Sequence, residues 1–165
     1  MRPRTYHLPI ESLSGFTAGV PVVQLKTATL IGCAITGIEL YQSTSTTIQF
    51  ITLTWSRRST ASTFPAGTTP RLVYPNDPAS GLTSSTTGNA VGVSTATGTV
   101  VADTNRTWQF LTLNGLHVNY RDADGNPGPN CITLLPGGTF GTFQFSVLSA
   151  VACTWNGWIE FMEIP

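Results

Sequence analysis

With 165 residues, the chain is long enough to form one domain with a sizeable hydrophobic core. Only 10% of its residues are charged and its formal net charge is zero, which argues against nucleic acid and anionic membranes as partners because both attract a cationic face. A weakly charged surface with no net charge also disfavours a soluble free monomer, so the composition indicates a protein that works within an assembly.

No targeting segment is predicted. The first residues, MRPRTYHLPIE, include two arginines but no apolar stretch of the kind a signal peptide needs. The longest apolar run, near Leu30–Ile38, is interrupted by glycine and threonine and is far shorter than the roughly 20 residues of a membrane helix. An odd number of widely spaced cysteines without a signal peptide favours buried thiols in a reducing cytoplasm. These cysteines are Cys33, Cys131 and Cys153.

Residues 1–11 are polar, contain two prolines and lack a clear period, so we expect an N-terminal arm outside the core. Residues 12–165 are then expected to form a single domain. The arm has too little apolar content to hold itself in place, but some of its side chains are suited to docking into a neighbouring subunit. These candidate interface residues are Tyr6, Leu8 and Ile10.

The main core is predicted in the stretch Thr27–Ser59, which follows a modest strand at Pro21–Lys26. Two runs rich in β-branched residues flank a polar break at Gln42–Thr46, and apolar side chains alternate in both runs. This pattern predicts two strands of a long antiparallel hairpin. A change of phase at Phe50–Ile51 suggests a β-bulge, because one extra residue reverses the facing of a strand.

Two basic residues, Arg57 and Arg58, end the second of these strands. Such a pair is either a solvated strand end or an anchor of an interface, where arginine is enriched. Both readings remain open from the sequence.

Thr60–Asn105 is the least regular stretch, with a proline-rich first half and a second half of low complexity. A loop of this length is unusual in a compact domain, so it either contains short strands, one near Thr97–Ala102, or meets a partner. Proline lowers the entropy lost on ordering, and tyrosine and arginine often anchor interfaces. The candidate contact residues of this loop are Pro70, Arg71, Leu72, Tyr74 and Pro75.

The remaining chain alternates short strands with turns. Strands are predicted at Arg106–Leu113, Leu116–Tyr120, residues 142–147 and Cys153–Ile164, and turns at Arg121–Pro129 and Pro136–Gly138. No stretch has the period of a long helix. The sequence therefore predicts an all-β fold, an antiparallel β-sandwich of jelly-roll type.

Chemical motifs are sparse. Asp122 to Asn126 resembles the start of a calcium loop, but the twelfth position is Thr133 instead of a carboxylate, which favours a plain turn. His7 and His117 lack the spacing of metal ligands. Glu160 and Glu163 are three residues apart on a strand and so face opposite sides, unlike a paired acid and base. We predict no catalytic residue, no metal site and no cofactor.

The tryptophans include two candidates for ligand binding. Trp55 and Trp108 fit a sandwich core, whereas Trp155 and Trp158 flank an Asn-Gly pair and are candidates for stacking on a sugar ligand.

Several motifs follow one another along the chain. They include LIGCAI at Leu30–Ile35, an arginine-ended strand at Trp55–Arg58, the proline-rich loop at Thr69–Ser80 and the ending at Gly157–Ile164. Their order resembles the small all-β structural proteins of tailed-phage and prophage virion gene clusters. Cys33 stands where these proteins have an aromatic residue, and Gln42–Thr47 lacks their acidic pair, which leaves the position in the virion open.

The resemblance implies a jelly-roll-type capsid cement or decoration protein, typically trimeric, without catalytic residues. We therefore expect a homotrimer on the capsid surface, made in the host cytoplasm and bound to the major capsid protein of the head shell. The alternative is a tail-fibre or receptor-binding β module that binds carbohydrate. An enzyme is not expected.

Overall fold

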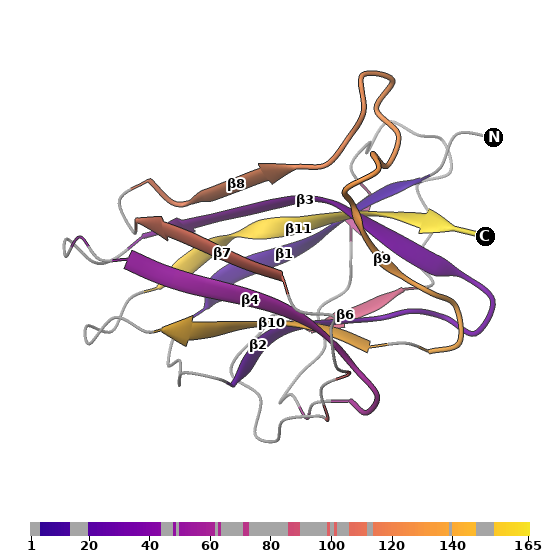
Figure 1. Ribbon diagram of the computed structural model, residues 1–165, viewed down its shortest axis with the longest axis horizontal. Helices are drawn as coiled ribbons and strands as arrows, with labels where there is room; N and C mark the ends of the chain where they lie inside the picture. Colours follow the sequence, from indigo (N-terminus) through magenta and orange to yellow (C-terminus); the bar gives the residue numbers. More distant parts are fainter. Residues whose placement is uncertain are drawn as a thin grey trace.

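The computed structural model describes residues 4–13, 20–43, 48, 50–61, 63, 71–72, 86–89, 99, 101, 106–111, 114–138, 140–147 and 154–165. Every regular element among them is a strand (Figure 1). In chain order the strands are β1 (Thr5–Leu13), β2 (Pro21–Lys26), β3 (Gly32–Gln42), β4 (Phe50–Arg58), β5 (Arg71–Leu72), β6 (Thr87–Asn89), β7 (Arg106–Leu111), β8 (Leu116–Asn119), β9 (Ile132–Leu134), β10 (Phe140–Val147) and β11 (Trp155–Ile164).

The strands form two antiparallel sheets that pack face to face. Sheet A has the order β5-β1-β11-β3-β8, with β9 also paired to β3, and sheet B has the order β6-β2-β10-β4-β7. Four antiparallel pairs are nested in one another: β1 with β11, β2 with β10, β3 with β8 and β4 with β7. A long ribbon of nested pairs rolled into two sheets is the jelly-roll arrangement, so the predicted sandwich is confirmed.

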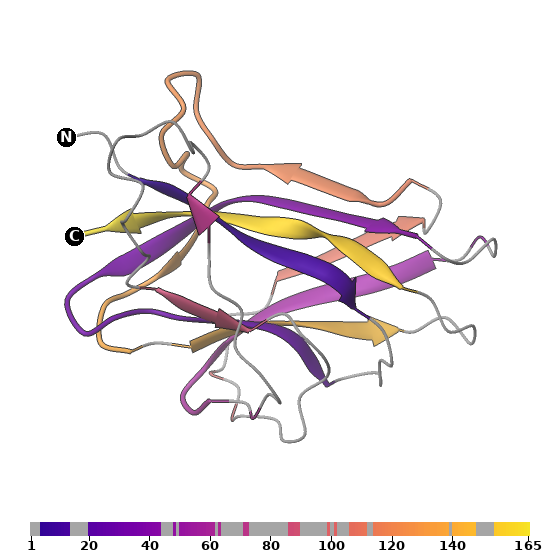
Figure 2. The same ribbon diagram turned by 180° about the vertical axis from the view of Figure 1, so that it is seen from behind.

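The N-terminal segment is a core strand and not an arm. β1 runs beside β11 along its length, as Figure 2 shows from behind. The side chains of Tyr6, Leu8 and Ile10 point into the core and are almost fully buried. The prediction that they dock into a neighbouring subunit is therefore wrong. Their alternation was present in the sequence, but the prolines and polar residues around it concealed the strand.

Pro9 lies within β1 without breaking it. Proline lacks the backbone N–H that would bond to a strand on one side, and it is tolerated at an edge where that side has no partner strand. Among the described residues, β5 reaches β1 only at Tyr6 and His7, which leaves the position of Pro9 paired with β11 alone.

The two strands of the predicted hairpin are both present, but they belong to different sheets. β3 pairs with β11, β8 and β9, whereas β4 pairs with β10 and β7. The hairpin prediction is therefore wrong: the chain crosses from one sheet to the other between them. Alternation specifies which face of a strand is buried, and two strands that face each other across a sandwich satisfy it as well as two that pair.

The predicted bulge at Phe50–Ile51 is also wrong. β4 keeps a continuous register with β7 from Phe50 to Trp55. Phe50 lies on the outer face of sheet B and is 72% exposed, while Ile51 is buried. The change of phase in the sequence therefore reflects an exposed phenylalanine and not an extra residue.

The other predicted strands agree with the structure. β2 spans the predicted residues, and β7, β8, β10 and β11 fall within the predicted stretches or overlap them closely. For the strand expected near residue 100, Thr99 accepts a backbone hydrogen bond from Ser59 and Val101 donates one to Arg57. The rest of that stretch lies outside the described residues.

The core joins the sheets through aromatic side chains. Trp155 of sheet A meets the edge of Phe110 of sheet B, with ring centres 5.8 Å apart. Within sheet B the ring of Trp55 fills the space beside Gly141, where a Cβ atom would lie 1.9 Å from it. Each large apolar side chain buried here contributes about 1.5–3 kcal/mol of stability.

Candidate functional site

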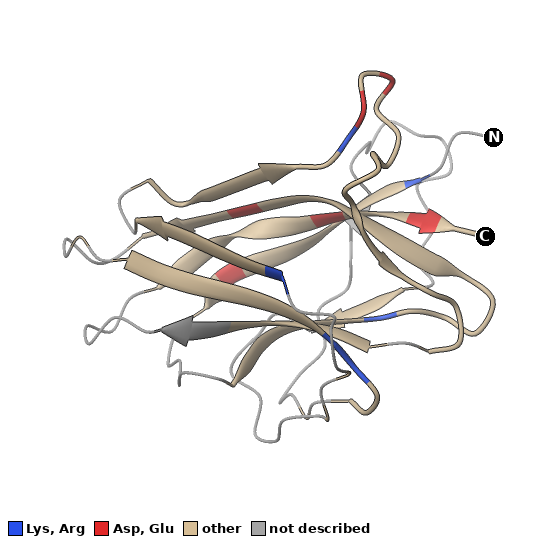
Figure 3. Ribbon diagram, viewed as in Figure 1, with Lys and Arg blue, Asp and Glu red and all other residues tan. Residues whose placement is uncertain are grey.

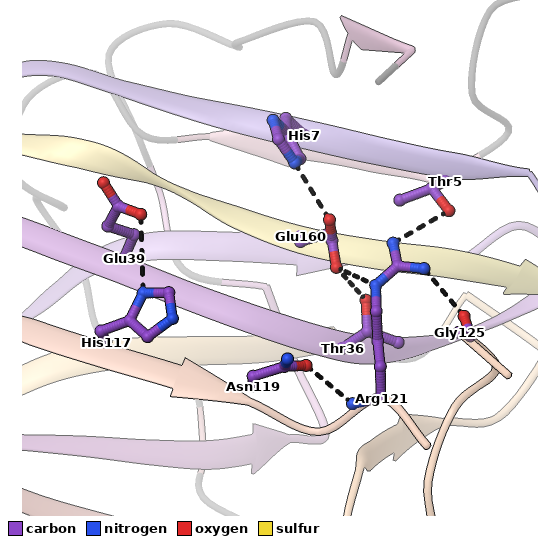
Figure 4. Close-up of polar contacts among 9 residues, drawn as sticks. All are labelled: Thr5, His7, Thr36, Glu39, His117, Asn119, Arg121, Gly125 and Glu160. Carbon is purple, nitrogen blue, oxygen red and sulfur yellow. Dashed lines mark hydrogen bonds and ion pairs between the residues drawn. The ribbon is translucent and has the colours of Figure 1, made fainter. Parts of the chain in front are cut away.

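The outer face of sheet A carries a buried carboxylate, Glu160. Its neighbours in β11, Ile159 and Phe161, face the core, so Glu160 points away from it, as the sequence predicted. Glu160 is nevertheless only 9% exposed. A side chain from the segment that follows β8, Arg121, lies against it (Figure 4).

Three side chains from distant parts of the chain converge on this carboxylate. Oε1 accepts hydrogen bonds from Thr36 Oγ1 at 2.8 Å and from Arg121 Nε at 2.7 Å. Oε2 lies 3.2 Å from His7 Nε2, which donates when that nitrogen carries the proton. The site thus joins β11, β3, β1 and the segment after β8, as Figure 4 shows.

Arg121 extends the network into the turn that follows it. Its Nη2 donates to Thr5 Oγ1 at 3.2 Å and its Nη1 to the carbonyl of Gly125 at 2.8 Å. The guanidinium therefore fastens the connection between β8 and β9 to the outer face of sheet A.

The turn itself is organised by Asp122. Its Oδ1 accepts backbone hydrogen bonds from Asp124 at 3.0 Å and Asn126 at 2.8 Å. This is the turn that the sequence favoured over a calcium loop. Within the described residues, no group of three or more histidine, cysteine or acidic side chains has the geometry to hold a metal ion.

The surroundings of Glu160 set its protonation. Burial alone would raise the pKa of this carboxyl, but hydrogen bonds from His7, Arg121 and Thr36, together with the charge of Arg121, outweigh burial and lower the pKa from 4.5 to about 2. Glu160 is therefore ionised at neutral pH and is a weak base. The arrangement suits a structural anchor for the β8–β9 connection better than proton transfer.

The two tryptophans proposed for sugar stacking lie on opposite sides of sheet A. Trp155 is 1% exposed and packs in the core against Phe110, so its predicted ligand role is wrong. Trp158 lies on the outer face, half-buried, and stacks on His7 with ring centres 4.4 Å apart and planes 3° from parallel. One face of the Trp158 ring is therefore covered by the protein itself.

Sheet B contains a second buried charge, Arg58. Its Nε donates to Thr142 Oγ1 at 3.0 Å and its Nη2 to Gln144 Oε1 at 2.6 Å, and the residue is 3% exposed. Burial lowers the pKa of this guanidinium. This burial contradicts both roles considered for Arg58, a solvated strand end and an interface anchor, whereas the half-buried Arg57 stays a candidate.

The remaining interface candidates belong to the proline-rich loop. Arg71 and Leu72 form β5, whose backbone pairs with His7 and Tyr6 of β1. Their role in contacts between chains stays a prediction. The other candidates of this loop lie outside the described residues; they are Pro70, Tyr74 and Pro75.

Sequence reasoning missed the Glu160–Arg121 pair, whose members are 39 residues apart. One signal pointed to it. Glu160 shares the outer face of an apolar strand with Trp158 and Met162, and a carboxylate among such neighbours requires a donor that covers it. The sequence does not identify Arg121 as this donor, because an arginine after a short strand is common at a solvated turn.

The two described cysteines differ in burial. Cys33 is fully buried, as predicted, and burial raises its pKa to about 12. Cys131 is half-buried, and both are free. Cys153 lies outside the described residues.

Comparisons of the chain with models of protein families, with curated proteins and with solved structures found no match. None of the described segments forms an apolar helix of membrane-spanning length. The function is therefore inferred from the fold, from the site on sheet A and from the sequence motifs.

Proposed function

We propose that this protein is a virion structural protein, a cement or decoration protein that binds the outside of a phage head shell and stabilises it. The observation that carries the proposal is the jelly-roll topology, with four nested antiparallel pairs in two sheets. Viral capsid domains are among the proteins built on this architecture. The order of motifs that resembles virion proteins supports the same role.

The polar site on sheet A is consistent with a scaffold. Glu160 accepts hydrogen bonds from Arg121, Thr36 and His7. Through Arg121 this network holds the long β8–β9 connection onto the sheet. A network that is satisfied within the chain rigidifies the fold. A rigid outer face is what a protein needs when it has to match a fixed lattice of binding sites.

Several exposed apolar side chains are available for contacts with other protein chains. Leu30 and Leu135 lie in connections between strands, at 82% and 58% exposure, and three more lie at the end where β3 leaves sheet A and β4 enters sheet B. These are Tyr41, Ile48 and Phe50. Apolar and aromatic residues are enriched in the centres of protein interfaces, so we propose these side chains as contacts with the major capsid protein or within a homotrimer.

The test uses purified particles. Mass spectrometry of complete virions should find the chain, and virions from which its gene is deleted should lose shell stability on heating. Added back, the purified protein should saturate the deleted shells and restore that stability. A chain that is absent from virions, or that does not bind shells lacking it, would rule out this function.

A variant sharpens the same experiment. Phe50→Ser removes an exposed aromatic ring from β4 and should weaken shell binding without lowering the melting temperature of the free protein. Thr107→Ser, at an exposed position of the neighbouring strand β7, is the matched control and should bind shells like the parent.

The carbohydrate-binding alternative has lost its main support, because Trp155 is a core residue and His7 covers one face of Trp158. A glycan array that shows binding, abolished by Trp158→Ala, would revive it.

A further inference from the structure

The sequence contains two Asn-Gly pairs, Asn114-Gly115 and Asn156-Gly157, and the structure places them in different settings. In such a pair the backbone nitrogen of the glycine can attack the asparagine side chain, because glycine has no side chain to hinder the approach. A bond forms between that nitrogen and the asparagine Cγ, ammonia leaves, and water then opens the cyclic imide to aspartate or isoaspartate. The reaction needs only water and a backbone that is free to move, so the fold decides which pair reacts.

Asn114-Gly115 lies in the turn between β7 and β8. Asn114 is exposed, and none of the residues that the structure describes hydrogen-bonds to its side chain. The attacking nitrogen, that of Gly115, donates to the carbonyl of Leu111 at 3.2 Å, and the backbone of Asn114 donates to the same carbonyl at 3.1 Å. Two donors thus share one acceptor at an exposed turn. Such turns open locally at a small cost in free energy, which releases the Gly115 nitrogen for attack.

Asn156-Gly157 is instead held within β11, inside sheet A. Gly157 pairs with β1 on one side and with β3 on the other. Asn156 Oδ1 accepts a hydrogen bond from the backbone of Ser12 at 2.8 Å, which ties the side chain to the neighbouring strand. A Cβ atom at Gly157 would lie 1.9 Å from the carbonyl oxygen of Glu39, so the two backbones are in close contact there. Attack on Asn156 therefore requires β11 to separate from its neighbours.

We propose that Asn114 is a site of spontaneous deamidation in the folded protein and that Asn156 is protected by the sheet. The modification adds a negative charge where the surrounding strand ends, those of β4, β7 and β8, carry no Lys, Arg, Asp or Glu (Figure 3). The isoaspartate product also lengthens the backbone by one carbon. The turn has little room for it, because Gly115 has a φ of +65° and a Cβ atom there would lie 2.4 Å from the carbonyl oxygen of Leu40.

The turn borders apolar side chains that are proposed above as contacts, so its consequence for binding rests on the proposed function. Phe50 pairs with Leu111, whose carbonyl accepts both hydrogen bonds of the turn. On the other side, a Cβ atom at Gly115 would lie 3.4 Å from Tyr41 Cα. A carboxylate among these side chains loses its water when a partner covers them, and an uncompensated buried charge is costly. Deamidated copies should therefore bind shells more weakly than fresh ones.

Isotope labelling tests the modification without any shell. The purified protein is incubated in mildly alkaline buffer made with oxygen-18 water, both folded and in concentrated urea, and its peptides are analysed by mass spectrometry after acidic proteolysis. Each imide that is hydrolysed takes up one heavy oxygen. The labelling rate in the folded state divided by that in urea should be at least tenfold larger for the Asn114 peptide than for the Asn156 peptide. Equal ratios, or an Asn114 peptide that is labelled in urea alone, would overturn the proposal.

A pair of variants checks that Asn114 accounts for the charge change. Asn114→Gln cannot form the five-membered imide and should not accumulate the acidic species that isoelectric focusing detects in aged protein. Asn130→Gln, at an exposed asparagine that precedes Cys131, is the matched control and should age like the parent. An acidic species that forms as fast in Asn114→Gln as in the parent would contradict the assignment.

Asn114→Asp carries the added charge from the start and tests the consequence for binding. It should bind gene-deleted shells at least about threefold more weakly than Asn130→Asp, which adds the same charge in the β8–β9 connection. Equal binding of the two variants would refute the effect on binding. Shells that bind neither the variants nor the parent would refute the proposed function, and the labelling ratios would still decide whether Asn114 is modified.

Discussion

The two sheets each bury one charged side chain on their outer face, and they compensate it in different ways. Glu160 of sheet A receives hydrogen bonds from a guanidinium, a hydroxyl and an imidazole, and its pKa falls to about 2. Arg58 of sheet B donates to a hydroxyl and an amide, and burial lowers its pKa. The surroundings of Glu160 favour its ionised form, whereas the burial of Arg58 disfavours its charged form.

The difference shows that burial alone does not decide how a charge affects stability. A buried charge costs free energy unless hydrogen bonds and an opposite charge compensate it. Glu160 has both, and it thereby fastens a connection to the sheet. Arg58 donates to the side chains of Thr142 and Gln144, which orient the guanidinium along β10. We therefore expect perturbations of sheet A to be the more costly.

The largest effect is expected for Arg121→Ala. This change removes the charge partner of Glu160 and leaves the carboxylate buried, which typically costs about 3–5 kcal/mol. We expect a loss of about 3 kcal/mol, at the lower end of this range. The Arg121 side chain is 20% exposed, so water can enter when it is removed and solvate the Glu160 carboxylate in part. Urea unfolding of parent and variant measures the loss.

Arg106→Ala is the matched control, since Arg106 also donates to a carbonyl of the β8–β9 connection but is exposed. Its loss should be about 1 kcal/mol or less. Equal losses for the two arginines would show that the buried carboxylate adds nothing, and the contrast between the sheets would disappear.

The next effect is a dependence on pH. Because the pKa of Glu160 is lower in the folded protein than the ordinary value of 4.5, its contribution is complete above that value and is lost as the pH falls towards about 2. At about 1.4 kcal/mol per pKa unit, the loss is about 3 kcal/mol at most.

Glu160→Gln isolates this contribution from those of the other carboxylates. The variant should be less stable than the parent at neutral pH, and the difference between the two should shrink between pH 4.5 and pH 2. Denaturation curves at several pH values measure it. A constant difference over this range would mean that Glu160 titrates normally in the folded state.

The smallest effect is expected for Arg58→Met. The change leaves Thr142 and Gln144 without one donor, which costs about 1–3 kcal/mol, but it also removes a buried charge and keeps most of the side-chain volume. We expect a net loss of about 1 kcal/mol in the unfolding free energy. A loss as large as that of Arg121→Ala would make Arg58 an ionic anchor too and would erase the difference between the sheets.

Local pattern was sufficient for most strands. In β11 the apolar residues Ile159 and Phe161 alternate with the outward Glu160, and the same period identified β10. The period of two reflects the geometry of a single extended chain, so it can be read without knowledge of neighbours. The absence of any long helical period likewise predicted an all-β sandwich.

The pairing of strands was decided by the tertiary structure. Backbone hydrogen bonds are available to every strand, so the pattern of β3 and β4 suited a hairpin as well as two facing sheets. β1 became a core strand because β11, more than 140 residues later, offers it an edge to pair with. The site depends on the same distant contacts: His7 and Glu160 are 153 residues apart, and only the rolled topology brings them within 3.2 Å.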